Sequence, residues 1–202
     1  MKKIMFNDKY GLTKAVLEGR KTQTRRFIPK EFFTLQWDER DDTLVVENEF
    51  GDFVDIRNTK FCMLKVGEIV AVAQNYTACG GFMDDGTPRW DYISCIVGSK
   101  NRGWSNKMFV KPELMPHQIK ITNVRIERLQ DISDDDCLAE SVEKIISEDG
   151  TPRYYVKDWK GDTMLATYTP QNAYSFLIDK VGKKGDWEIN PCVFVYDFEL
   201  IK

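Results

Sequence analysis

The residues of this chain that are best suited to chemistry lie in one short segment, residues 19–26, which reads Gly-Arg-Lys-Thr-Gln-Thr-Arg-Arg. It holds four cations, two hydroxyls and a carboxamide, a density of polar groups that the packing of a core does not require. A basic, threonine-rich run is also typical of a solvated strand with charged edges, and composition alone favours that interpretation. The density of polar groups nevertheless makes the segment a candidate site.

Lys21 and Thr24 are the two residues of this segment that could act together. Strand alternation would place them on opposite faces, whereas a turn after Gly19 would bring residues three apart onto one side. A hydroxyl is a poor nucleophile at neutral pH, and a lysine can activate it if burial or nearby cations lower the lysine pKa. The geometry of residues 19–24 thus decides whether the pair can react.

Three stretches of the chain, in this order, resemble the ASCH domain family. They are the segment at residues 19–26 behind a short helix, the acidic block at residues 131–140, and the closing stretch at residues 190–199. The closing stretch is similar to that of the longer, phage-associated branch. The resemblance implies a PUA-like barrel and a single domain over residues 1–202.

Some small bacterial ASCH proteins are amidohydrolases that release the acetyl group from N4-acetylcytidine. The resemblance implies a Lys, a Thr and a Glu at their site, which fall by motif on Lys21, Thr24 and Glu140. Thr24 would be the nucleophile and Lys21 its base, while Glu140 would protonate the departing amine or hold Lys21 in place. This chain is much longer than those hydrolases and has Ser141 where many relatives have Gly, so its loops could occlude or re-purpose the pocket.

The leading prediction is the binding of RNA or a nucleoside-type ligand in a cleft between residues 20–26 and Glu140, as the resemblance to RNA-binding PUA-like barrels implies, and the amidohydrolase is the alternative. Guanidinium groups would hold phosphates, and an exposed Trp90 or Trp104 would stack bases. The residues expected to bind the ligand are Arg20, Thr22, Arg25 and Arg26. A third alternative, a phage or prophage accessory protein without catalysis, rests on the likeness to the longer branch alone.

Composition narrows the classes of function. The 202 residues, 42% of them hydrophobic, suit one domain with its own core. A net charge of −3 argues against broad, sequence-indifferent nucleic-acid binding and leaves room for a local basic patch. Five cysteines without a C-x-x-C pair and a single histidine, His117, give no pattern for a metal site or a Ser-His-Asp triad. We therefore expect no metal and no cofactor.

The N-terminal sequence turns polar at Asn7-Asp8, too early for a signal peptide, and no apolar run approaches the ~18 residues of a membrane helix. From these features we expect a soluble, cytoplasmic protein without a membrane partner.

Periodicity predicts the elements that position the candidate site. Helices are expected at residues 9–18, from Asp134 to about Lys144 behind a Ser133 cap, and from Pro170 to Gly182. Strands are expected at residues 43–47, 52–57, 68–74, 92–97, 118–129 and 192–200, with a bulge near Asn123. Long loops, at residues 75–90 and 98–117, are read as insertions. The prediction is an α+β fold, a small bent β-barrel with about three short helices and long inserted loops.

Overall fold

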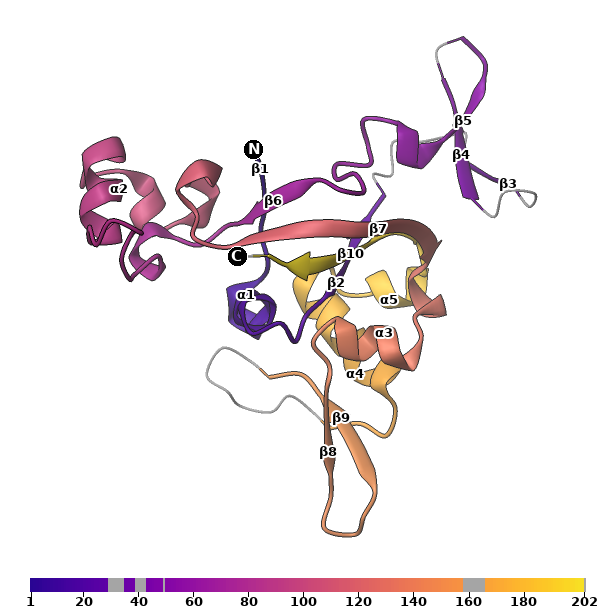
Figure 1. Cartoon of the computed structure of the whole chain (residues 1–202). Coiled ribbons are helices and arrows are strands. Elements are labelled where there is room, and N and C mark those ends of the chain that lie inside the picture. The colour runs from indigo at the N-terminus through magenta and orange to yellow at the C-terminus, as the bar shows by residue number, and fades with distance from the viewer. Residues whose placement is uncertain (29–34, 39–42, 49, 158–165, 202) are drawn as a thin grey trace.

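A five-stranded mixed sheet forms the centre of the molecule (Figure 1). The computed structural model describes residues 1–28, 35–38, 43–48, 50–157 and 166–201. The strands, in their order across the sheet, are β1 (Lys2–Ile4), β6 (Ile69–Val72), β7 (Gln118–Arg128), β10 (Cys192–Leu200) and β2 (Gln23–Phe27). The β1–β6 pair is parallel and the other pairs are antiparallel.

The long strands β7 and β10 pair with each other in the interior of the sheet. β7 buries alternate side chains on either side of a change of phase, whereas β10 buries the four consecutive residues 193–196. On β7 the buried positions change phase between Ile121 and Val124. The register shifts at the same place, since Asp197 pairs with Asn123 and Phe198 with Ile121. Thr122 is thus an extra residue, and the predicted bulge near Asn123 is confirmed.

Helices gather on one side of this sheet (Figure 1). α3 (Asp134–Ala139) and α5 (Asp186–Ile189) both pack against α4 (Pro170–Val181), and α1 (Leu12–Leu17) lies on the same side of the sheet. Within the described ranges no helix has both the length and the apolar character that crossing a membrane requires.

Three parts project from the centre (Figure 1). One is a small antiparallel sheet of β3 (Gln36–Asp38), β4 (Thr43–Glu47) and β5 (Phe53–Asp55). Another is the hairpin of β8 (Glu143–Ile146) and β9 (Pro152–Tyr155). The third contains α2 (Arg89–Val97) and several 3-10 turns.

The α+β class is confirmed, with five α-helices in the described residues where about three were expected. A closed barrel is not confirmed: the two edge strands, β1 and β2, form no ladder in the described part of the chain. Their edges approach one another where the Arg26 guanidinium donates to the Met5 carbonyl at 2.8 Å. The sheet is therefore open along the seam between β1 and β2.

Two local predictions are wrong. Residues 92–97 form part of α2 rather than a strand, because Trp90, Ile93 and Val97 follow helical spacing while Ile93 alone among the helix's residues is buried. The helix that begins at Asp134 ends at Ala139, five residues before the predicted Lys144, and the chain then enters the β8 strand.

Candidate functional site

Lys21 is positioned by the C-terminal end of α1. Gly19 adopts a left-handed conformation with φ +71°. Its N–H donates to the Val16 carbonyl, and the Arg20 and Lys21 N–H groups both donate to the Ala15 carbonyl. The first two of these bonds make a Schellman motif, in which glycine is favoured because it has no Cβ to clash. The predicted turn after Gly19 therefore exists, and the chain reverses before Lys21 starts toward β2.

Glu140 is positioned by the same device at the end of α3. Ser141 has φ +85°, its N–H donates to the Leu138 carbonyl, and the Val142 N–H donates to the Cys137 carbonyl. Serine thus occupies the left-handed position that glycine favours, which costs conformational energy. A glycine at this position would avoid that cost, because glycine has no Cβ. This geometry leaves Glu140 as the last residue before the chain turns.

The two helix ends dock through the backbone. The Thr22 N–H donates to the Ala139 carbonyl at 3.0 Å, and the Thr22 carbonyl accepts from the Phe198 N–H at 2.8 Å. The predicted partners Lys21 and Glu140 consequently meet. The Lys21 amine contacts the Glu140 carboxylate in a short ion pair and also donates to the Glu140 backbone carbonyl at 3.3 Å.

Burial of the Lys21–Glu140 ion pair changes the pKa of Lys21. The Lys21 and Glu140 side chains are 1% and 5% exposed. Burial lowers the pKa of Lys21 below its ordinary value, because desolvation penalises the ammonium form. The Glu140 carboxylate opposes that shift, whereas the nearby Arg26 and Arg25 guanidinium groups add to it. A buried amine with a lowered pKa can lose and accept a proton closer to neutral pH.

Thr24 completes a small cleft beside the ion pair. The cleft has a volume of about 40 Å³, and its lining includes Phe6, Lys21, Thr24, Arg26 and Glu140. Thr24 is 4% exposed. In the described part of the chain no hydrogen bond engages its hydroxyl, which is thus available to a group that enters the cleft.

Comparisons with known proteins do not decide what this site does. No family model matches the chain. Searches of curated proteins and of solved structures also found no match. The chemistry of the site must therefore be argued from its own geometry.

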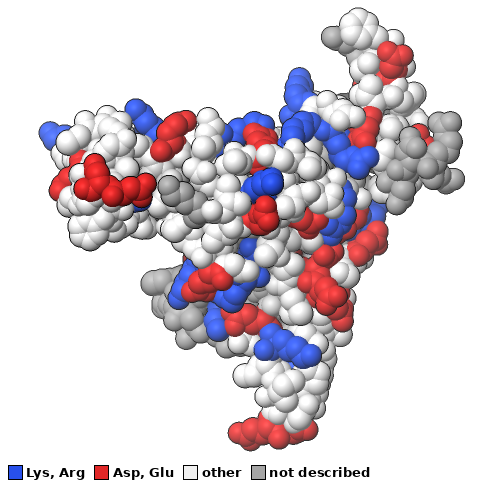
Figure 2. Space-filling view, in the orientation of Figure 1, with Lys and Arg blue, Asp and Glu red and all other residues white. Residues whose placement is uncertain are grey.

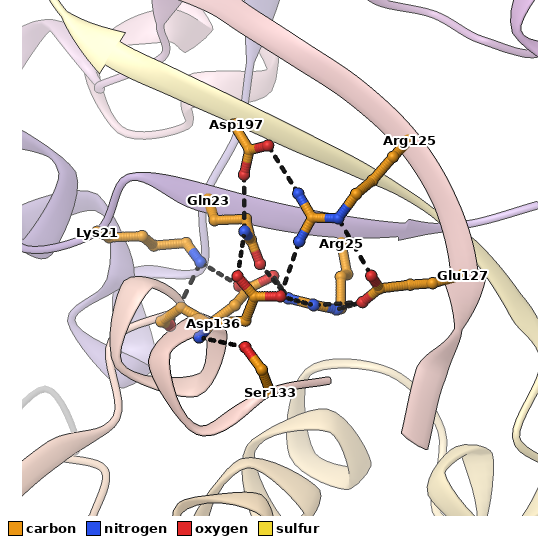
Figure 3. A network of polar contacts seen from close by, with 9 residues as sticks. Lys21, Gln23, Arg25, Arg125, Glu127, Ser133, Asp136 and Asp197 are labelled. Carbon is orange, nitrogen blue, oxygen red and sulfur yellow. Dashed lines mark hydrogen bonds and ion pairs between the residues drawn. The ribbon is translucent and has the colours of Figure 1, made fainter. Parts of the chain in front are cut away.

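Arg25 points away from solvent into a network of carboxylates, which Figure 3 shows beneath β7 and β10. Its side chain is 1% exposed and pairs with Glu127, with Asp136 at 3.2 Å and with Glu140 at 3.2 Å. Its Nη1 also donates to the Gln23 side chain. Arg25 therefore connects the Glu140 carboxylate to the interior and is fully engaged by protein partners.

Arg125, which sequence reasoning did not single out, closes the other side of this network (Figure 3). It contacts Asp197 and Asp136 at 2.7 Å each and Glu127 at 3.2 Å. The Gln23 amide donates to Asp136 at 2.8 Å and to Asp197 at 2.6 Å. Alternation gives a hint of this arrangement, because Arg125 and Glu127 are charged residues on one face of a strand whose other face is apolar.

The acidic first turn of α3 has two roles. Ser133 caps the helix by accepting from the Asp136 N–H at 3.1 Å, as predicted. The Asp136 side chain also ties the helix to β2 and β7 through Arg25 and Arg125. The second role was missed because it depends on strand pairing between residues that lie far apart in sequence.

The remaining predicted ligand-binding residues, Arg20, Thr22 and Arg26, differ in their position relative to the cleft. Arg20 is exposed and paired with Glu18 at 2.6 Å and Glu143 at 3.2 Å. Thr22 is exposed next to the cleft and does not line it. Arg26 lines the cleft directly, and burial lowers its pKa.

The aromatic residues expected to stack bases lie outside the cleft. Trp90 is exposed on α2. Trp104 packs edge-on against Tyr76 and donates its indole N–H to the Gly98 carbonyl at 2.9 Å, so it anchors a loop.

Cys137, on α3 close to Arg25, is a poor candidate nucleophile. Burial raises the pKa of its thiol to about 12, so the thiol stays protonated near neutral pH. Cys137 also does not line the cleft, whereas Thr24 lines it together with Lys21.

Proposed function

We propose that this chain is an ASCH-type amidohydrolase that cleaves the acyl amide of an N4-acylated cytidine or a similar acylated nucleoside. The observation that carries the proposal is the buried Lys21–Glu140 pair in one cleft with the unengaged Thr24 hydroxyl. A base with a lowered pKa, a carboxyl group and a nucleophile are the parts that acyl transfer needs.

The first half-reaction forms an acyl-enzyme. The neutral Lys21 amine accepts the Thr24 hydroxyl proton as Oγ attacks the amide carbonyl, which becomes a tetrahedral oxyanion. Arg26 lines the cleft and supplies a cation for that oxyanion. When the carbon–nitrogen bond breaks, the proton passes from Lys21 to the departing exocyclic nitrogen, either directly or relayed through the Glu140 carboxylate. The nucleoside leaves as the free amine, and the acyl group remains on Thr24 as an ester.

The second half-reaction returns the protein to its starting state. Lys21, again neutral, takes a proton from water as the water oxygen attacks the ester carbonyl. Collapse of the second tetrahedral intermediate returns the proton to Thr24 Oγ and releases the carboxylic acid. The Glu140 carboxylate orients the Lys21 amine throughout, and Arg25 holds Glu140 from the opposite side at 3.2 Å.

The size of the cleft supports this assignment over RNA binding by the basic segment. A volume of about 40 Å³ admits a small group such as an acyl amide, while a whole nucleoside must lie partly outside. Arg20 and Arg25 each pair with carboxylates, so these two predicted phosphate contacts are neutralised by the protein itself. Residues 19–26 therefore offer less unpaired positive charge to a phosphate backbone than their four cations suggest.

The test is a turnover assay with N4-acetylcytidine, following cytidine and acetate together. Wild type is expected to release both in equal amounts. Thr24→Ala and Lys21→Ala should each lower the rate by at least about 10³-fold, and the double variant should lose little more, because residues that act as a unit are not additive. Glu140→Gln should cost about 10²- to 10⁴-fold. Thr122→Ala, at an exposed threonine on β7, is the matched control and should keep the wild-type rate.

Two results would count against the proposal. Folded wild type that releases no cytidine from any acylated nucleoside in a panel of acetyl, propionyl and benzoyl derivatives would reject the hydrolase assignment. Turnover that survives Thr24→Ala would reject the acyl-enzyme mechanism.

A further inference from the structure

A second and much larger hollow shares Arg26 with the cleft. Its volume is about 730 Å³, within the ~300–1,000 Å³ typical of small-molecule sites. Residues 2–5, at and just after β1, form one wall, and residues 59–65 form another. Arg26 of β2 and Tyr196 of β10 also line it, so it lies along the open seam between the two sheet edges. We call it the basic cavity.

The charged groups of the basic cavity are of one sign. Its described lining contains five cations and neither Asp nor Glu, in a chain whose net charge is −3. Figure 2 shows Lys and Arg side chains gathered on this face between β7 and the β3–β4–β5 sheet. The cations that line the cavity are Lys2, Lys3, Arg26, Lys60 and Lys65. Such a concentration attracts anions, because the low-dielectric walls strengthen the field of like charges.

Most of these cations are hydrogen-bonded but not charge-neutralised. Lys65 donates to the Thr59 carbonyl at 3.3 Å, and Arg26 donates to the Met5 carbonyl at 2.8 Å. Among the ion pairs of the described residues, Lys2 alone of the five has a carboxylate partner. A carbonyl satisfies an N–H donor without cancelling the charge, so the positive potential of the cavity remains available to a ligand.

The rest of the lining is apolar. Leu64 and Ile4 are buried walls, while Met5 and Met63 are exposed at 41% and 60%. Methionine side chains adapt in shape and make favourable contacts with aromatic rings. A ligand that fits therefore combines several negative charges with a flat or apolar body.

We propose that the basic cavity is a nucleotide-binding site, in which the cations hold phosphate and the methionine-bearing walls contact the base. The nucleotide is either free or one residue of a single strand, since both present the same chemistry. This inference goes beyond the proposed hydrolase, because binding here does not depend on acyl transfer at Thr24. Arg26, which lines both hollows, makes the two sites neighbours.

Calorimetric titration with cytidine 5′-monophosphate, cytidine and inorganic phosphate tests the proposal. The monophosphate should bind at least about tenfold more tightly than either cytidine or phosphate alone, because only it engages both parts of the lining. The double variant Lys60→Glu, Lys65→Gln should weaken monophosphate binding by about tenfold or more and leave cytidine binding within about twofold. Gln at position 65 retains a donor for the Thr59 carbonyl.

Lys9→Glu is the matched control. Lys9 lies 5.5 Å from the Tyr10 ring centre as Lys60 lies 5.3 Å from that of Phe61, and Lys9 lies outside the cavity lining. It should leave monophosphate affinity unchanged. Lys60→Glu alone, at an exposed side chain, repeats the test if the double variant unfolds.

Thr24→Ala separates this proposal from the hydrolase, since it should abolish turnover and leave monophosphate affinity within about twofold of wild type. A hexacytidylate that binds at least about tenfold more tightly than the monophosphate identifies the strand as the source, and equal affinity identifies the free nucleotide. Monophosphate binding no tighter than phosphate, or equally reduced by Lys9→Glu, would overturn the proposal.

Discussion

The cleft and the basic cavity share Arg26, but their other cations differ in burial and in the partners that they contact. In and behind the cleft, Lys21 and Arg25 are buried and paired with carboxylates, Lys21 with one and Arg25 with three. In the cavity, Lys60 and Lys65 are exposed, and the contacts shown for them are to backbone carbonyls or a ring. The partner of a cation in the folded chain, rather than the presence of the cation in the sequence, thus decides whether it can bind an anionic ligand.

This contrast predicts very different losses of stability for the deletion of two cations. Arg25→Met leaves the carboxylates of Glu127, Asp136 and Glu140 without that guanidinium, and should cost about 3–5 kcal/mol of the free energy of unfolding. Lys60→Met removes a charge that has no carboxylate partner in the described residues, and should change stability by at most about 0.5 kcal/mol. Urea unfolding of both variants measures the difference. Similar losses in the two would remove the basis of the comparison.

The pH dependence of turnover tests the proposed role of Lys21 in the cleft. In the proposed mechanism Lys21 acts as a neutral base, so the rate should rise with pH through the Lys21 pKa, which burial holds below the ordinary lysine value. Arg26 lowers that pKa further, so Arg26→Gln should move the rising limb to higher pH. A pH–rate profile of both proteins is the measurement. A limb that stays in place, or moves to lower pH, would contradict the role of Lys21.

The smallest change in stability is expected at the C-terminal end of α3, which carries Glu140. Ser141 is held at φ +85°, and its buried hydroxyl has no hydrogen-bond partner among the described residues. Ser141→Gly should therefore stabilise the protein by about 1 kcal/mol and raise Tm by about 2–4 °C. Asn190→Gly, also at positive φ, is the control and should give no gain, because the Asn190 side chain accepts from the Gln130 N–H at 2.8 Å. Loss of stability in Ser141→Gly would show that the strain assignment is wrong.

The sequence predicted much of the frame that holds the site. Hydrophobic periodicity located α1, α4, β7 and β10, because each has a regular buried face, and Gly19 marked the turn before Lys21. The strand predicted at residues 92–97 failed because β-branched and aromatic residues there form a helix with one buried position.

Partnerships between distant residues could not be read in the same way. Motif position implied that Lys21 and Glu140 belong together, and they do meet. The sequence around Arg25 gave no sign that its guanidinium would pair with carboxylates on β7 and α3, because those ion pairs depend on the strand order β7-β10-β2. The basic cavity was missed for the same reason, since Lys60 and Arg26 become neighbours only in the folded chain.

In the proposed mechanism, Thr24 carries the acyl group between the two half-reactions. Equimolar wild type and N4-acetylcytidine should be mixed, quenched in acid at successive times and digested for peptide mass spectrometry. We expect one acetyl group on Thr24, formed together with free cytidine and lost as acetate appears, and none on the corresponding peptide of Thr24→Ala. Cytidine released by wild type without acetylation of Thr24 at any time, with the same release by Thr24→Ala, would contradict the account.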